Sequence, residues 1–240
     1  MEKMQSVAFA VALIGLMPRC ACWETYRVGP GEKYANLSQV AAQLGPGDTV
    51  LITGDIVDSV RFSRNGSVDN PITIRGVTRV ENGRIIRPRI TPPKATTIIT
   101  CDGDHYVLDG LEITGIPVPK SEQILGIQHN CDGLVIRNCY IHHLTYKPLV
   151  GTPTSGSITM EFCEIESCER LDIWSWRKGY QAIVRFCYFH DMHDTMLKTH
   201  AWRNVICYNW FENTFNSAIR VVDQLGRMSN LDPSAYPMHT

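Results

Sequence analysis

The segment Ile183-Val184-Arg185-Phe186-Cys187-Tyr188-Phe189-His190 decides the fold, because the chain repeats its pattern. The clearest counterparts begin at Val135, Thr159 and Val205, so successive copies lie 24, 24 and 22 residues apart. In each copy, short runs of alternating apolar residues are interrupted at one position where the chain bends. The repeat therefore predicts short β-strands that recur with every turn of a coil.

Weaker copies extend the repeat toward the N-terminus, at Val107–Ile113, Pro71–Ile74 and Val50–Ile52. Too few residues separate the copies for helical crossovers between parallel strands. A coil in which each repeat forms one rung, with strands of successive rungs paired in parallel about 4.8 Å apart, accommodates all of these segments. We therefore predict an all-β fold, a right-handed, single-stranded parallel β-helix.

Equivalent positions of successive rungs should stack in columns, and the apolar columns should face the interior of the coil. We expect three inward columns: Ile136, Met160, Val184 and Ile206; Ile141, Ile165, Phe189 and Phe211; and, between them, Asn138, Phe162, Phe186 and Tyr208. Two outward columns alternate between basic and acidic residues, as favourable neighbours on adjacent strands do: Arg137, Glu161 and Arg185; and His142, Glu166, His190 and Glu212.

Three cysteines, Cys139, Cys163 and Cys187, fall in one column at the bend. Stacked neighbours are close enough for a disulfide, but their parallel Cβ directions suit a relaxed disulfide poorly. We expect buried thiols that fill the corner, with disulfides as the alternative. Cys163 with Cys168 is the expected local pair if one forms.

The N-terminal segment is typical of a secretory signal. Lys3 precedes an apolar run from Val7 to Met17, which is too short to span a bilayer comfortably and is ended by Pro18. We predict a signal peptide over residues 1–22 and a β-helix domain over residues 23–240, secreted to the periplasm or the cell exterior. A buried N-terminal helix is the alternative.

A short capping helix is predicted over about residues 36–45, where it would cover the first rung of the coil. Asn36 is a favourable N-cap, Gly45 follows the segment, and apolar residues recur between them at helical spacing. No comparable cap is visible at the other end, where residues 230–240 are polar and contain proline, so the C-terminal end of the coil could be incomplete.

Composition excludes some classes of partner. The net charge is −1 and the pI is about 6.7, so no global positive field favours nucleic acid. No membrane contact is expected once the signal is removed, and we expect a monomer. Attraction for an anionic ligand would have to come from a local patch.

One column of strands carries such a patch. Segments at 126–129, 171–176, 195–200 and 217–221 align if Ile127, Ile173, Leu197 and Ile219 all point inward. Alternation then directs an outward row of Gln128, Trp174, Lys198 and Arg220, with Asp172, Trp176 and His200 beside it. Adjacent Lys198 and Arg220 repel each other, which an anionic ligand would explain, although both side chains could instead be solvated. Exposed tryptophans suit stacking on sugar rings.

Acidic residues near these rungs suggest a metal ion. Carboxylates of Asp191 and Asp194 could hold Ca²⁺. The alternative is that these aspartates serve the turns in which they lie, and that the neighbouring His190 belongs to the outward ladder. The pair His142-His143 is discounted as a metal site in the same way.

The chain resembles the pectate-lyase-like superfamily of right-handed β-helices, over roughly residues 26–224. The segments Gly45–Val50 and Asp69–Gly76 look like the opening rungs common there. Lys198 and Arg220 are similar in arrangement to the catalytic Lys and Arg that alginate lyase and chondroitinase B-like polysaccharide lyases place on adjacent rungs. In those proteins Ser follows the Lys and His-Gly the Arg, whereas Thr199 and Val221-Val222 follow here.

The resemblance implies β-elimination on a uronic-acid-containing polysaccharide. Lys198 would be the base, since repulsion by Arg220 favours its neutral form, and Arg220 or Ca²⁺ would bind the uronate carboxylate. His200 is the alternative acid or base, and Trp174 and Trp176 would stack on neighbouring sugars. A glycoside hydrolase that uses two carboxylates, a C5-epimerase on the same fold, and a non-catalytic glycan-binding protein are the alternatives.

Overall fold

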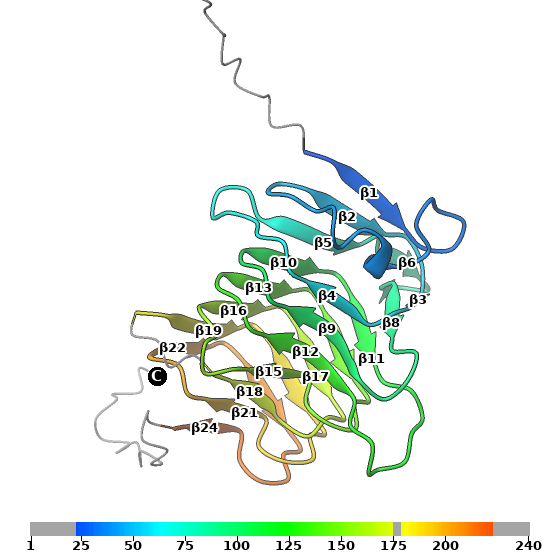
Figure 1. Cartoon of the computed structure of the whole chain (residues 1–240). Coiled ribbons are helices and arrows are strands. Elements are labelled where there is room, and N and C mark those ends of the chain that lie inside the picture. The colour runs from blue at the N-terminus through cyan, green and yellow to red at the C-terminus, as the bar shows by residue number, and fades with distance from the viewer. Residues whose placement is uncertain (1–22, 175–178, 223–240) are drawn as a thin grey trace, which may run out of the picture.

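The computed structural model describes residues 23–174 and 179–222. Over this range the chain forms a parallel β-helix of about eight turns, built from three parallel sheets that run the length of the coil (Figure 1). The predicted β-helix is thereby confirmed. Residues 1–22, where a signal peptide is predicted, lie outside the described range, as do Trp176 and the C-terminal residues after Val222.

The three sheets each take one strand from nearly every rung. Sheet A contains β1 (Thr25–Val28), β2 (Thr49–Ile52), β5 (Ile72–Gly76), β10 (Tyr106–Asp109), β13 (Leu134–Arg137), β16 (Ile158–Glu161), β19 (Gln181–Arg185) and β22 (Arg203–Cys207). Sheet B contains β3 (Ile56–Val57), β8 (Arg89–Thr91), β11 (Glu112–Thr114), β14 (Tyr140–His142), β17 (Glu164–Glu166), β20 (Tyr188–His190) and β23 (Trp210–Glu212). Sheet C contains β4 (Val60–Phe62), β9 (Thr97–Cys101), β12 (Leu125–His129), β15 (Leu149–Gly151), β18 (Leu171–Ile173), β21 (Leu197–Thr199) and β24 (Ile219–Val221). A short antiparallel hairpin, β6 (Arg79–Glu81) with β7 (Arg84–Ile86), lies between β5 and β8 in the chain.

The two predicted inward columns that begin with Ile136 and Ile141 do face inward. In sheet A, Ile136 pairs with Met160, Met160 with Val184, and Val184 with Ile206. Ile136, Met160 and Val184 are completely buried. Sheet B repeats this with a second column, in which the rings of Phe189 and Phe211 stack 5.1 Å apart. Each rung thus adds the same apolar groups to one continuous core.

The prediction that the bend residues stack inward is wrong. Phe162, Phe186 and Tyr208 are 53%, 43% and 78% exposed, and Asn138 is exposed as well. All four adopt a left-handed conformation with φ between 54° and 56°, which interrupts the alternation of side chains and turns them outward. The exposed rings form an aromatic ladder, with centroids 5.1 Å apart between Phe162 and Phe186 and between Phe186 and Tyr208.

The cysteine after each left-handed residue points inward instead. Cys139, Cys163 and Cys187 are buried, and each thiol lies against a backbone carbonyl of its own bend. All seven cysteines of the described range are free, including Cys168. Burial and the neighbouring thiols raise the pKa of Cys163 well above its ordinary value, so this thiol stays protonated.

The predicted N-terminal α-helix is wrong. Residues 37–39 form a single 3-10 turn, after which the chain continues in turns. Leu37, Val40 and Leu44 are nevertheless fully buried. Two of its backbone bonds, Val40 N–H to Leu37 O and Gln43 N–H to Val40 O, span only three residues, as in a 3-10 helix rather than an α-helix. Ser38 is held by Asp58, which accepts hydrogen bonds from both its backbone N–H and its hydroxyl. No helix among the described residues is long and apolar enough to cross a membrane.

Candidate functional site

The outer face of sheet C carries the predicted row of polar residues, in a register that differs from the predicted one. The structure aligns Val150, Asp172, Lys198 and Arg220 on successive strands β15, β18, β21 and β24. Trp174 lies beyond the end of β18. The shift arises because the connection from β20 to β21, residues 191–196, is two residues longer than the connection from β17 to β18, residues 167–170.

Lys198 and Arg220 are direct neighbours, as the sequence predicts. They pair across β21 and β24, so their Cα atoms are separated by one rung, about 4.8 Å. On β21, Lys198 lies between Leu197 and Thr199, which point inward and are completely buried. Their burial fixes the strand and directs Lys198 outward. Both charged side chains are half-buried.

Asp172 is the next member of the row, and its carboxylate lies in a buried ion-pair network. Its Oδ2 is 2.7 Å from Lys147 Nζ, and its Oδ1 accepts a hydrogen bond of 3.0 Å from Arg170 Nε. Arg170 also donates to Asp194 Oδ2, at 2.7 Å. Asp172 is only 1% exposed. It therefore supports the outer face from beneath, and a direct contact with a sugar, as expected from the sequence, would require it to leave both cations.

Lys147 shows how strong this network is. Burial by itself would lower the pKa of the Lys147 ammonium, but hydrogen bonds to Asp172 and Tyr146 outweigh it and leave that pKa above the ordinary value. Lys147 therefore remains charged inside the network.

The charges of Lys198 and Arg220 stand in contrast to this network. Lys147, Asp172, Arg170 and Asp194 alternate in sign and neutralise one another. Within the described residues, by comparison, no carboxylate lies within 4 Å of Lys198 or Arg220. The outer face of sheet C thus presents two adjacent positive charges that the described part of the fold does not neutralise. Their neighbour in the row, Asp172, is already neutralised by Lys147 and Arg170.

An aromatic pair borders these cations. The indole ring of Trp174 lies over the imidazole ring of His200, with centroids 4.4 Å apart and planes inclined by 33°. Trp174 is half-buried, whereas His200 is 6% exposed. Desolvation, reinforced by the charge of Lys198, lowers the pKa of His200 to about 4. The imidazole is therefore neutral at physiological pH.

The lowered pKa of His200 makes stability depend on pH. The unfolded chain binds a proton at His200 near pH 6.5 and the folded chain only near pH 4. The contribution of the buried, neutral imidazole to the free energy of unfolding is therefore complete above about pH 6.5 and is lost as the pH falls toward about 4. We expect the free energy of unfolding, measured in urea at pH 7, 5.5 and 4, to fall less steeply for His200→Phe than for the native chain. Parallel pH profiles for the two proteins would contradict this assignment.

Gln128 lies farther from the cations than the sequence suggests. It belongs to the same outward row, but Val150 and Asp172 separate it from Lys198. Three rungs correspond to roughly 14 Å along the coil. Gln128 could therefore contact only a ligand that extends along the face. Trp176 lies outside the described residues.

Asp191 and Asp194 do not make a convincing calcium site. Asp191 Oδ2 is 2.8 Å from His190 Nδ1, and its other oxygen accepts a hydrogen bond from Asn213. Asp194 is held by Arg170 and by Asn216. A guanidinium on one carboxylate and an imidazole on the other leave few oxygen ligands for a cation that takes six to eight. The residues present do not fit Ca²⁺.

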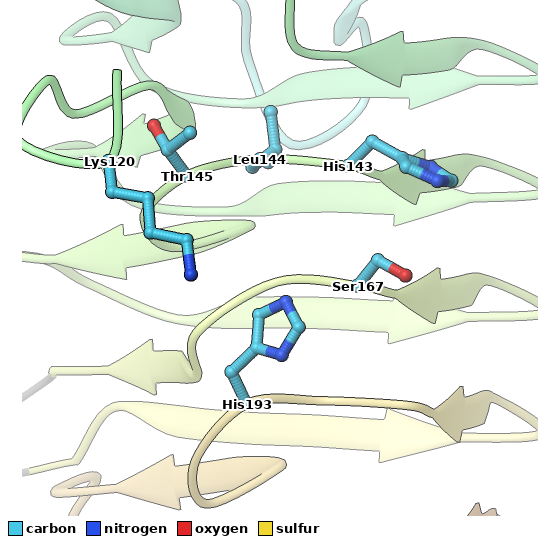
Figure 2. A pocket seen from close by; sticks show the side chains of 6 residues that line it. All are labelled: Lys120, His143, Leu144, Thr145, Ser167 and His193. Carbon is cyan, nitrogen blue, oxygen red and sulfur yellow. The ribbon is translucent and has the colours of Figure 1, made fainter. Parts of the chain in front are cut away.

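A cavity of about 530 Å³ adjoins the connection that leads into β21. Figure 2 shows Lys120 and His193 pointing toward one another across it, with Thr145 and Ser167 at its edge. The ring of His143 is turned away from both. The sequence repeat gave no reason to single out Lys120, which comes from a longer connection between β11 and β12.

The sequence also missed Lys147 and Arg170, which hold Asp172. Each precedes its sheet C strand by one or two residues, Leu149 and Leu171 being the first residues of β15 and β18. The sequence signal that could have identified them is that a basic residue stands just before each of two successive sheet C strands.

Comparisons with known proteins agree with the fold. No protein-family model and no curated protein matches the sequence. Among solved structures, a PL6 family polysaccharide lyase from Pseudopedobacter saltans matches with a TM-score of 0.54 and 16% identity, over 77% of this chain and 50% of that one. Pectate lyase Pel9A matches with a TM-score of 0.55 and 14% identity, over 83% and 62%. An alginate lyase from Paenibacillus sp. matches at a TM-score of 0.39.

The chain therefore spans about half the length of the PL6 structure and less than two thirds of the pectate lyase. At these identities the likeness concerns the fold, and the chain has the parallel β-helix of the pectate-lyase-like proteins.

Proposed function

We propose that this protein is a secreted polysaccharide lyase that cleaves a uronic-acid-containing polysaccharide by β-elimination. The carrying observation is the pair of adjacent, outward cations Lys198 and Arg220, which the described fold does not neutralise while it neutralises the charges next to them. An anionic ligand on this face would supply the missing countercharge. The structural neighbours are lyases by name, which agrees with the proposal. Residues 1–22 would be the secretory signal and residues 23–240 the β-helix domain that carries the activity.

In this reaction Arg220 binds the uronate carboxylate. Its guanidinium can hold a carboxylate through two parallel hydrogen bonds, which withdraws charge from the carboxylate and acidifies the neighbouring C5–H bond. Lys198, once it has lost its own proton, removes the C5 proton, the electrons form the C4–C5 double bond, and the C4–O bond breaks. The proton now on Lys198 is available to the departing glycosidic oxygen. No step needs a metal ion.

Trp174 and His200 would flank the reacting sugar. Trp174 offers part of its ring face for stacking on a sugar, and His200 holds the other face of the indole. Because His200 is buried and neutral, we assign it a positioning role and keep Lys198 as the base.

Glycoside hydrolysis is less well supported. It needs one carboxylic acid and one carboxylate facing the scissile bond. Asp172 and Asp194 both bind Arg170, and Asp172 is buried.

The test is an assay against alginate, pectate and glycosaminoglycans, with Ca²⁺ and with a chelator. Ultraviolet absorbance reports the unsaturated uronate end that elimination creates. We expect absorbance to rise with one substrate class and to persist in the chelator. New reducing ends without absorbance would indicate a hydrolase, C5 proton exchange without cleavage an epimerase, and binding without either a glycan-binding protein.

Arg220→Lys tests the role of the guanidinium. Lysine keeps the charge but loses the bidentate geometry, so we expect kcat/KM to fall by roughly 10²–10³-fold, the cost of removing one preorganised charge-stabilising group. The matched control is Arg203→Lys. Arg203 begins β22 of sheet A, which lies between β21 and β24 in the chain, and no effect on kcat/KM is expected. Equal activity of Arg220→Lys and the native chain would contradict carboxylate binding by Arg220.

A further inference from the structure

The outer face of sheet B contains a second constellation that the proposed reaction does not use. His142 and His143 lie at the end of β14, and Glu166 lies on the adjacent strand β17. In a regular strand, consecutive side chains point to opposite faces, so His142 and His143 would point apart. His143 has a left-handed φ of 51°, which interrupts the alternation and brings both rings to the same side.

The ligand atoms of these three residues converge. The Nδ1 atoms of His142 and His143 are 2.6 Å apart, and His143 Nδ1 is 3.6 Å from Glu166 Oε1. All three ligand atoms lie within 4.8 Å of one another. Ligands bonded to a tetrahedral zinc ion at 2.0–2.1 Å are separated by about 3.3 Å, so the observed distances bracket the expected value.

The two imidazole rings meet through their Nδ1 atoms. Two imidazole nitrogens at 2.6 Å cannot both carry a hydrogen, so without a metal one donates a hydrogen bond to the other, and a metal ion bound to both would replace that proton and separate the nitrogens to about 3.3 Å. Thr114 Oγ1, at 3.4 Å from His142 Nδ1, is the nearest other donor and is at the limit of hydrogen-bond distance.

A supporting set of hydrogen bonds already orients the ligands. His142 Nε2 is 3.2 Å from Glu112 Oε1, and that carboxylate is held in turn by Arg89. With its Nε2 hydrogen donated to Glu112, His142 has a free lone pair at Nδ1, which is the arrangement found behind most metal-binding histidines. Tyr140 donates its hydroxyl to Glu166 Oε1 at 2.6 Å and fixes the third ligand.

We propose that His142, His143 and Glu166 bind a divalent transition-metal ion of the Zn²⁺ class. Two imidazoles and one carboxylate select such an ion over Ca²⁺ and Mg²⁺, which prefer oxygen ligands. His142 and Glu166 are largely covered, at 13% and 17% side-chain exposure, whereas His143 is 65% exposed and leaves the ion open to solvent or to a further ligand. The ion would also tie two successive rungs together.

The neighbouring group of Glu164, Glu166 and His190 is a weaker candidate. His190 Nε2 lies 3.3 Å from both glutamates, and its Nδ1 is held by Asp191. These carboxylates raise the pKa of His190 against the opposing effect of burial. The contacts of His190 with both glutamates already satisfy this group without a metal.

The experiment is a titration of metal-free full-length protein with Zn²⁺ against a chromophoric chelator, together with Co²⁺ absorption spectra. We expect one Zn²⁺ per chain and the visible absorption of nitrogen-coordinated Co²⁺. His143→Ala, at an exposed position, should abolish both without unfolding the coil. Glu112→Gln should weaken binding about 10–100-fold, as loss of a supporting carboxylate does.

Two matched variants make the result decisive. His193→Ala removes an exposed histidine from the cavity that His143 also lines, and His190→Ala removes the histidine of the neighbouring group; both should retain Zn²⁺. Binding that survives His143→Ala but not His190→Ala, or no stoichiometric binding by the native chain, would overturn the proposal. These readouts do not depend on lyase activity.

Discussion

Lys198→Ala is expected to lower kcat/KM for the release of unsaturated uronate ends by about 10²–10⁴-fold, the usual contribution of a general base. The fold should survive, because Lys198 points outward and has no ion pair within the described residues that its removal would break. Circular dichroism and the midpoint of urea unfolding check the fold, and ultraviolet absorbance checks the reaction.

Lys198→Arg separates two roles of the lysine. Arginine retains the positive charge but does not lose its proton in proteins, so it cannot act as a base. If Lys198 is the base, the arginine variant should be as inactive as the alanine variant. Activity near that of the native chain would mean that Lys198 serves only as a charge. Lys120→Ala, in the cavity of Figure 2, serves as a control for loss of a lysine outside the row of Lys198 and should leave the activity unchanged.

Asp172→Ala is expected to reduce the free energy of unfolding by about 3–5 kcal/mol, the typical effect of removing one partner of a buried ion pair. The substitution would leave the ammonium of Lys147, 8% exposed, and the guanidinium of Arg170 without their shared carboxylate. Urea unfolding followed by circular dichroism measures the change. Asp69→Ala, at an exposed position, should stay within about 0.5 kcal/mol of the native chain.

A double variant identifies the cause. Lys147→Met combined with Asp172→Leu removes both charges and replaces them with apolar groups. If the loss in Asp172→Ala comes from uncompensated charge, the double variant should be more stable than either Lys147→Met or Asp172→Leu alone. A double variant as unstable as the sum of the two would indicate lost packing instead.

The sequence predicted the columns of sheets A and B because their spacing is regular. Ile136, Met160 and Val184 recur every 24 residues, and each pairs with the next as expected. The outward ladder was predicted in part: Arg185 bonds Glu161, but Arg137 turns to Asp109 on the preceding rung. Long side chains can choose between neighbours above and below, and spacing does not decide between them.

The candidate site was harder to predict, because it lies where the spacing changes. Lys198 and Arg220 were paired correctly, since no residue is added between their rungs relative to the repeat. Trp174 was placed beside Lys198, whereas the longer turn at 191–196 brings Asp172 there. The rung containing Leu149–Gly151 was passed over, because Leu149-Val150-Gly151 has no polar residue at its centre by which an alternating pattern could be recognised.

The aromatic ladder carries a consequence for how such a coil can change over evolutionary time. Asn138, Phe162, Phe186 and Tyr208 differ chemically, yet they share one backbone conformation. Within this chain the corner is therefore constant as a shape of the main chain, while the side chain that it displays differs from rung to rung. Duplication or deletion of a whole turn would preserve every column, while the outward corner positions acquire new surface chemistry one rung at a time.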